Sequence, residues 1–441
     1  MKALLAVIFS LAIGATAALP LAAAAAQVDA SAVATRLLDH MEAGDFAAAL
    51  AGFTPQMKAA LGADKLAAVQ QQINGAGAAT GRDAPKLAQQ SGMTVVVVRL
   101  HRANASLDAT IAVDAEGKVA GLHYAPAPSP PAAAPAVDAP YLERETQVGE
   151  GPRALPATLA MPKAQLAAGK RVPAVVLVHG SGPQDRDQTI GPNRPFLDIA
   201  RGLAAQGIAV LRYEKRSKAR PQDFAAGDFT VDDETTNDAV AAVQSLRGVE
   251  GIDPARIFVL GHSQGGMMAP RIAQRSGQVA GLVMLAAPAR SVLTLLAEQN
   301  RYLVSLDGSI SAEEQAHLDQ LDAQIAALRS GGDIAAADTP MGAPAAYWRS
   351  IDAVDPVAEA EASQLPLLLL QGGRDFQVVA ADWQLWRKAL AGDPRATLRH
   401  YPALNHLGVS GSGPGSLADY QTPGHVDAAL ISDVAAWISA H

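Results

Sequence analysis

The sequence predicts an α/β protein with a doubly wound, mostly parallel sheet and a helical cap insertion, preceded by a small α+β domain. Three observations predict this fold class. Apolar strand patterns alternate with helical patterns over residues 140–441. An Ala- and Pro-rich run at residues 125–139, APAPSPPAAAPAVDA, reads as a semi-rigid linker before them. A glycine-flanked serine stands where one strand pattern passes into a helical pattern.

Composition narrows the class of protein. The chain has 441 residues, of which 49% are hydrophobic and 18% charged, enough for one large domain and a smaller one. Its formal net charge is −8 and it has no lysine- or arginine-rich block, so we expect neither nucleic acid nor an anionic membrane as a partner. It has no cysteine, which excludes disulfides and lipid attachment through a cysteine.

The first 26 residues, MKALLAVIFSLAIGATAALPLAAAAA, are typical of a secretory signal peptide. Lys2 forms a short basic region, an apolar stretch follows, and small residues offer a cleavage site near Ala26. The alternative is an uncleaved membrane anchor, which Pro20 and the alanine-rich end make a weaker interpretation. We therefore expect a periplasmic or secreted bacterial protein that begins at Gln27, with no stable membrane insertion after cleavage.

Residues 27–124 predict the small α+β domain. Two helical patterns flank a break at Gly44 and Asp45, and three strand patterns follow at 93–100, 109–113 and 118–124. The charged residues are scattered, with no cluster suited to acid–base or metal chemistry. We expect structural support or substrate recognition from this domain.

The second part of the chain predicts the sheet. Strand patterns lie at 174–179, 209–213, 257–260, 282–286, 367–370 and 396–401. Helical patterns lie near 195–206, 234–247, 264–275, 380–391 and 425–440. Several strands are apolar without alternation, as a parallel sheet buried on both faces requires. Residues 290–350 interrupt this rhythm with further helical patterns, which predicts a cap over a site.

The candidate nucleophile is Ser263, in the stretch RIFVLGHSQGG at 256–266. A Gly-x-Ser-x-Gly motif between a strand and a helix is the setting of a nucleophile elbow. The helix N-terminus favours developing negative charge, and the backbone N–H of Gln264 would face an oxyanion there. The alternative is a serine that merely caps the helix between two packing glycines.

A nucleophilic serine needs a base and an acid that orients the base. Asp375 falls in the loop after one late strand pattern, and His406 falls in the loop after the next. Because open α/β sheets gather their sites at the carboxyl ends of the strands, we predict Ser263, Asp375 and His406 as a catalytic triad.

Alternatives exist for each partner. Asp375 could instead cap a helix or form an ion pair with Arg374. His400 and His425 are rival bases, although one lies inside a strand pattern and the other starts the last helical pattern.

A second oxyanion donor is expected in the loop after the early strand pattern, at HGSG. The N–H of Ser181 is the first candidate and that of Gly182 the second. His179 is expected to pack and to hold this loop rather than to act as a second base. The charged run at 184–187, QDRD, would either shape the acyl pocket or form an internal ion-pair brace, and we favour the brace.

Four stretches carry a resemblance to a known family: residues 175–217, 261–266 (GHSQGG), 368–378 (LLLQGGRDFQV) and 401–407 (YPALNHL). The second part of the chain resembles α/β-hydrolases of the bacterial serine esterase and serine aminopeptidase-like group. More narrowly, the whole chain is similar to secreted esterases that carry a small N-terminal domain of the DUF3887 type.

This resemblance implies an α/β-hydrolase fold and carboxylesterase activity on short acyl esters, with Ser263, Asp375 and His406 as the triad. It implies a small-molecule ester as partner, and neither a metal nor an organic cofactor is needed. One departure is Glu214, where the family's pattern leads us to expect aspartate.

Two other functions stay open. A peptidase on the same scaffold would have to turn acidic residues of the cap, such as Glu313 and Glu314, toward the site. A cell-envelope binding protein would retain the hydrolase part only as a vestige. The sequence leaves the oligomeric state undetermined.

Overall fold

The computed structural model describes residues 28–90, 92–103, 105–127, 132–277 and 279–441. The expected signal peptide at 1–26 lies outside the described residues. The chain divides into two compact units, Met1–Pro130 and Pro131–His441, each with its own core. In the described part of the chain, no helix combines the length and the apolar character needed to span a membrane.

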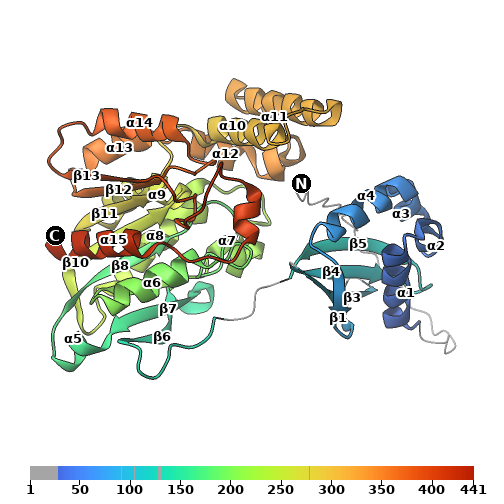
Figure 1. The fold of residues 1–441 in the computed structure, drawn as a ribbon, viewed down its shortest axis with the longest axis horizontal. Coiled ribbons are helices and arrows are strands. Elements are labelled where there is room, and N and C mark those ends of the chain that lie inside the picture. Colours follow the sequence, from blue (N-terminus) through green and yellow to red (C-terminus); the bar gives the residue numbers. More distant parts are fainter. Residues whose placement is uncertain (1–27, 91, 104, 128–131, 278) are drawn as a thin grey trace. The chain divides into compact units, whose positions relative to one another are not determined.

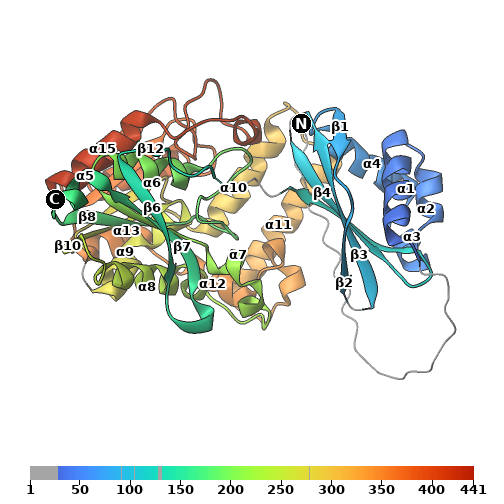
Figure 2. The same cartoon turned by 90° about the horizontal axis from the view of Figure 1, so that it is seen from below.

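The first unit packs helices against one face of an antiparallel sheet, as Figure 2 shows. Its helices are α1 (Ala30–Ala43), α2 (Phe46–Ala51), α3 (Pro55–Ala60) and α4 (Ala63–Asn74). The expected break is confirmed: Gly44 ends α1 in the left-handed conformation, and the Asp45 carboxylate accepts from the Ala48 N–H to begin α2.

The sheet of this unit has five strands: β1 (Ala79–Arg82), β2 (Lys86–Gln90), β3 (Met93–Arg102), β4 (Ser106–Val113) and β5 (Val119–Pro126). Alternate residues of β3 and β4 are buried. They share one buried core with the apolar faces of the helices, which includes Leu38 and Met41 of α1 together with Val96 and Ile111.

The expectation of two helices and three strands for this unit was incomplete. Helices α3 and α4 and strands β1 and β2 are present as well. Helix α3 buries no residue, α4 buries Leu66, Gln70 and Ile73, and β1 and β2 are exposed along their whole length. Helix α3 and strands β1 and β2 bury so little that they leave no apolar periodicity in the sequence, whereas α4 carries Leu66, Val69 and Ile73 at helical spacing and was overlooked.

The second unit is built on an eight-stranded sheet in the order β13-β12-β11-β10-β8-β9-β7-β6. Its strands are β6 (Tyr141–Val148), β7 (Leu155–Pro162), β8 (Val172–Val178), β9 (Ala209–Tyr213), β10 (Ile252–His262), β11 (Gly281–Leu285), β12 (Leu367–Gly372) and β13 (Ala396–Tyr401). The strands from β8 to β13 pair in parallel. This confirms the predicted mostly parallel sheet.

Strands β6 and β7 were not predicted. They form an antiparallel edge, with β7 paired to β9. Strand β6 carries a charged, largely exposed stretch that lacks the apolar pattern of the central strands. Strand β7 is largely buried and apolar, but Pro156 and Pro162 argue against a strand within a sheet.

Helices cover both faces of this sheet (Figure 1). Helices α6 (Pro195–Ala205) and α15 (Ala428–Ala440) bury one face, and α8 (Asn237–Leu246), α9 (Gln264–Ser276) and α14 (Ala380–Ala389) bury the other. Each face has its own cluster of buried apolar residues, which explains why the central strands are apolar throughout. Short helices α5 (Lys163–Ala167) and α7 (Arg216–Ala219) complete the unit.

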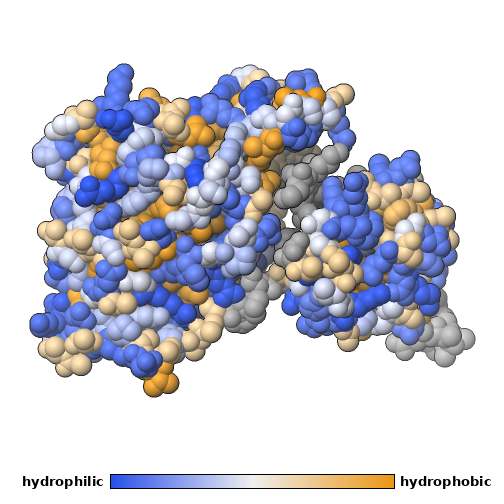
Figure 3. All heavy atoms as spheres, in the orientation of Figure 1, coloured by the Kyte–Doolittle hydropathy of each residue, from blue (hydrophilic) through white to orange (hydrophobic). Residues whose placement is uncertain are grey.

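The insertion between β11 and β12 is helical, as predicted. It contains α10 (Val292–Ser305), α11 (Ala312–Ser330) and α12 (Ala345–Asp352), and α13 (Pro356–Ser363) then leads back to β12. Figure 3 shows one face of the molecule's surface, on which hydrophilic residues predominate and apolar residues lie between them. Met341, near the start of α12, is 80% exposed.

Candidate active site

Ser263 occupies a sharp turn between β10 and α9. Its φ of 54° and ψ of −122° lie in a region that residues with a side chain rarely adopt. Its hydroxyl makes no capping hydrogen bond to the helix, so the interpretation as a mere capping serine is wrong. Backbone strain of this kind is often found at functional positions, where the surrounding structure holds the residue in place.

The flanking glycines are sterically required by this turn. A Cβ at Gly261 would lie 2.1 Å from the carbonyl oxygen of Gly265, and one at Gly265 would lie 2.2 Å from that of Val178. Strand β10, helix α9 and the end of β8 therefore approach one another more closely than any side chain allows. The glycines present Ser263 at the carboxyl end of the central strands.

Asp375 and His406 lie together, as predicted. The Nδ1 of His406 is 2.7 Å from the Oδ2 of Asp375, and both side chains are buried. The other carboxylate oxygen, Oδ1, accepts from the N–H groups of Gln377 and Val378, at 2.8 and 2.9 Å. Since a carboxylate only accepts, Nδ1 of His406 carries the proton and Nε2 is left with a free lone pair.

The alternative partners lie elsewhere. Arg374 pairs with Asp419 at 3.1 Å and does not pair with Asp375. His400 is exposed on β13, and His425 is 88% exposed beside Asp198. Of these histidines, His406 alone meets a buried carboxylate.

Ser263 is linked to His406 through its neighbour in the chain. The Nε2 of His262 donates to the carbonyl oxygen of His406 at 2.8 Å, and the two rings lie 4.6 Å apart between centroids. Among the described residues, the Ser263 hydroxyl itself has no hydrogen-bond partner. Hydrogen bonds between a nucleophile and its base often tighten only when substrate is bound.

His262 belongs to a buried chain of hydrogen bonds that also reaches the loop after β8. Its Nδ1 accepts from the Nε2 of Gln188 at 2.8 Å, and the Oε1 of Gln188 accepts from the Gly180 N–H at 3.1 Å. Burial lowers the pKa of His262 to about 3, so the ring is neutral at neutral pH and can accept on Nδ1 while it donates on Nε2. This chain ties the HGSG loop, the nucleophile turn and the histidine loop together.

Two backbone N–H groups beside Ser263 are free to bind an oxyanion. Gln264 begins α9, where the first N–H groups have no partner within the helix. Ser181 follows Gly180, and a Cβ added to Gly180 would lie 3.2 Å from the Cβ of Ser263. Neither N–H donates a hydrogen bond within the described part of the chain. The predicted donors thus lie in a loop and a helix terminus that both border the serine.

His179 has the packing role that was expected. It is buried between Phe196 and Tyr213, and its Nε2 bonds to the carbonyl oxygen of Asp185 at 3.0 Å. Burial lowers its pKa to about 3, which keeps the ring uncharged.

The charged run at 184–187 forms an internal ion-pair brace, the role that we favoured over shaping the acyl pocket. Arg186 pairs with Glu214 at 2.9 Å and with Glu145 at 2.5 Å, and Asp187 pairs with Arg212. Glu214, the departure from the family's pattern, therefore serves this brace.

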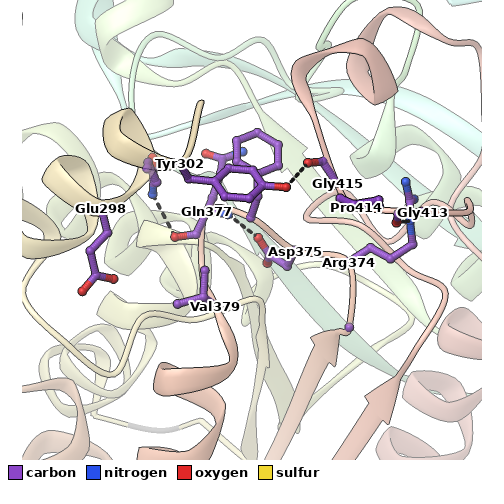
Figure 4. Close-up of a pocket in the computed structure, with 12 residues that line it drawn as sticks. Glu298, Tyr302, Arg374, Asp375, Gln377, Val379, Gly413, Pro414 and Gly415 are labelled. Atoms are coloured by element: carbon purple, nitrogen blue, oxygen red, sulfur yellow. Dashed lines mark hydrogen bonds between the residues drawn. The ribbon is translucent and has the colours of Figure 1, made fainter. Parts of the chain in front are cut away.

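A cavity of about 230 Å³ lies between α10 of the cap and the loop of Asp375 (Figure 4). The Tyr302 hydroxyl donates to the carbonyl oxygen of Gly415 at 2.7 Å, and the Tyr302 ring stacks on Phe376 with centroids 5.7 Å apart. Asp375 contributes to its wall, whereas neither Ser263 nor His406 does. The cavity is therefore distinct from the space in front of the serine.

No cluster of residues suited to hold a metal ion occurs in the part of the chain that the structure describes. The chemistry of the site is that of a hydroxyl, an imidazole, a carboxylate and two backbone donors.

Comparison with known proteins identifies the family of the chain. A family described as serine aminopeptidase, S33, matches residues 171–409, which include all three predicted triad residues and more than half of the chain. The chain belongs to this family. The second unit of this family member accordingly has an α/β-hydrolase fold, as the resemblance implied. Residues 34–122 match a separate family, a protein of unknown function called DUF3887.

Individual relatives are also similar to this S33 family member. Esterase EstD of Thermotoga maritima is 39% identical over 334 residues, which cover 75% of this chain and 76% of EstD. The solved structure of Est1E from Butyrivibrio proteoclasticus is 16% identical with a TM-score of 0.43, covering 67% of this chain and 99% of Est1E. A puromycin-hydrolyzing peptidase of Mycobacterium tuberculosis is 20% identical with a TM-score of 0.44, covering 80% and 47%.

Sequence reasoning missed several polar residues that surround the site. They are Gln188 and His262 of the buried chain described above, and the buried pair Lys215 and Glu234. The only available signal was that polar residues stand beside strongly apolar strands, which does not say which partners they meet.

Proposed function

We propose that the chain is a carboxylesterase that hydrolyses short acyl esters through an acyl-enzyme on Ser263. The observation that carries the proposal is the buried 2.7 Å contact of His406 with Asp375, with the His406 backbone hydrogen-bonded to His262, the neighbour of the strained Ser263. The similarity to EstD, which is named an esterase, supports the choice of ester as substrate.

In the acylation step, the Ser263 hydroxyl attacks the ester carbonyl while Nε2 of His406 takes its proton. The carbonyl oxygen becomes an oxyanion, which the N–H groups of Gln264 and Ser181 bind. Asp375 holds the His406 ring in the required tautomer and stabilises the imidazolium that forms. The imidazolium then protonates the leaving alcohol as the bond from the acyl carbon to the alcohol oxygen breaks.

In the deacylation step, His406 takes a proton from water, which attacks the acyl carbon of the acyl-enzyme. The second oxyanion uses the same two donors. Its collapse releases the carboxylic acid and returns the proton from His406 to Ser263.

The alternative is a peptidase, in keeping with the family's description. The acidic cap residues that it was expected to use do not support it. Glu314 forms a capping box with Ser311 at the start of α11, and Glu313 is exposed. A peptidase would have to anchor the charged end of its substrate with other residues.

A comparison of p-nitrophenyl esters with aminoacyl p-nitroanilides separates the two functions. We expect kcat/KM for p-nitrophenyl acetate or butyrate to exceed that for any aminoacyl anilide by at least about 100-fold. The size of that ratio follows from the weaker leaving group of the anilide and from the lack of a charged anchor. Equal or higher kcat/KM on the anilides would favour the peptidase, and no turnover of either class would favour a vestigial hydrolase that only binds.

We also propose that the protein is exported, on the strength of the N-terminal sequence pattern. The expected observation is an intact mass that begins at Gln27 for protein recovered from a periplasmic fraction or the medium of its bacterial host. Recovery of chains that begin at Met1 in the membrane fraction would favour the anchor instead.

A further inference from the structure

A buried ion pair outside the triad lies next to the proposed oxyanion donors. The Nζ of Lys215, which follows β9, is 2.6 Å from the Oε1 of Glu234, and the two side chains are 3% and 5% exposed. Transfer of two charges out of water is costly, and a buried pair is weak evidence for stability. Glu234 also lies in a π-helical turn, Asp232–Thr236, a distortion that is frequent at functional sites.

Lys215 makes a second contact, with the backbone of the HGSG loop. Its Nζ donates to the carbonyl oxygen of Gly180 at 2.7 Å. That carbonyl and the N–H of Ser181 belong to one planar trans peptide unit, so they point in opposite directions. By fixing the carbonyl, Lys215 fixes the direction of the Ser181 N–H. A cation on the oxygen also polarises the peptide and makes its N–H a stronger donor.

Glu234 reaches the other donor residue. Its Oε2 accepts from the side-chain Nε2 of Gln264 at 2.9 Å and from the Thr235 hydroxyl at 2.6 Å. The Oε1 of Gln264 in turn accepts from the hydroxyl of Tyr347 on cap helix α12, at 3.1 Å. Both polar atoms of the Gln264 side-chain amide thus have partners, and the backbone N–H of Gln264 is the other proposed donor.

We propose that Lys215 is a positioning residue for ester hydrolysis, which aligns and polarises the Gly180–Ser181 peptide as an oxyanion donor. Glu234 holds Lys215 in place and orients Gln264, so one ion pair serves both donors. The inference rests on the proposed function, because an oxyanion must form for the donors to act.

The matched control is Arg216, the next residue in the chain. Arg216 also forms ion pairs, with Asp238 at 2.5 Å and Asp223 at 2.9 Å, and its remaining hydrogen bond is to the carbonyl oxygen of Arg153. Arg216→Met therefore removes a cation from the same short segment without touching the peptide that precedes Ser181.

The experiment measures steady-state hydrolysis of p-nitrophenyl butyrate by the full-length wild-type, Lys215→Met and Arg216→Met proteins. Loss of a whole oxyanion donor costs about 100- to 1,000-fold in kcat, so loss of its alignment is expected to cost about 10- to 100-fold. KM is expected to change by less than about threefold, because the donors bind the transition state more strongly than the ester. Arg216→Met is expected to retain kcat within about threefold.

A second readout separates positioning from a general loss of structure. A short-chain trifluoromethyl ketone forms a tetrahedral adduct with the serine whose oxyanion occupies the hole. Its inhibition constant is expected to rise for Lys215→Met by the factor by which kcat/KM falls, while inhibition by a neutral alcohol, butan-1-ol, stays unchanged. If Lys215→Met does not fold, as judged by circular dichroism, the same measurements on Glu234→Gln replace it, because that change keeps the shape of the side chain.

Wild-type turnover tests the proposed function, and the variants test this inference. The inference is overturned if a folded Lys215→Met protein hydrolyses the ester at the wild-type kcat. It is also overturned if Lys215→Met and Arg216→Met lose activity equally, or if the alcohol and the trifluoromethyl ketone lose affinity by the same factor. A wild-type protein that does not hydrolyse the ester would instead count against the proposed esterase.

Discussion

Substitution of Ser263 by alanine is expected to lower kcat for p-nitrophenyl butyrate by roughly a million-fold. The estimate follows because the triad acts as a unit, and removal of the nucleophile leaves only binding and the oxyanion donors. The fold should persist, because the hydroxyl makes no hydrogen bond within the described residues and alanine keeps the Cβ. Progress curves at high enzyme concentration, with circular dichroism alongside, measure both effects.

The control for this variant is Ser245→Ala, which removes a hydroxyl that donates to the Ala242 carbonyl oxygen in α8. It is expected to hydrolyse the ester at the wild-type rate. Retention of more than about one thousandth of wild-type kcat by Ser263→Ala, after exclusion of contaminating enzyme, would show that another group is the nucleophile.

Replacement of Asp375 by asparagine is expected to lower kcat by about ten-thousand-fold, through the tautomer of His406. The Oδ1 of Asp375 accepts from two backbone N–H groups, those of Gln377 and Val378. An asparagine would place its carbonyl oxygen there and turn its NH₂ toward Nδ1 of His406. The ring would then carry its proton on Nε2 and could not take one from Ser263.

The same assay at pH 7 to 8 measures this effect, and a crystal structure of the variant would show the amide orientation. A loss smaller than about tenfold would mean that Asp375 does not orient the base. Asp419, which is close by and pairs with Arg374, provides a comparison. Asp419→Asn is expected to change kcat by less than about threefold.

The sequence was most informative where the fold repeats one rule. Parallel strands buried on both faces are apolar throughout, as β12 is, and the carboxyl ends of parallel strands carry the site. Asp375 could therefore be chosen from its place after β12, and His406 from its place after β13, the partly exposed edge strand that follows. The glycines beside Ser263 were equally clear, because their backbones approach too closely for a Cβ.

The sequence was least informative about contacts between distant polar residues. Gln188 meets His262, and Lys215 meets both Glu234 and Gly180, across separations that no local pattern records. Most lysines are exposed to solvent, and the residues next to Lys215 in the sequence give no sign that this lysine is buried against a peptide. Such networks depend on how the loops converge in three dimensions.

Weakly buried elements were missed for a different reason. Helix α3 and strands β1 and β2 bury no residue, so polar residues serve there as well as apolar ones. Helix α4 does bury Leu66 and Ile73, and its short apolar pattern was overlooked. Strand β6 lies at the edge of the sheet and is charged, as edge strands often are.

Ser263 is expected to become covalently acylated with help from His406 and Asp375. Reaction with a fluorophosphonate, followed by intact-mass measurement and peptide mapping, detects the modified serine itself. We expect one adduct per chain, on the peptide that contains Ser263, with no adduct on Ser263→Ala and at least about 1,000-fold slower labelling of His406→Ala. An adduct on another residue, or ester hydrolysis by a protein that the reagent leaves unmodified, would contradict it.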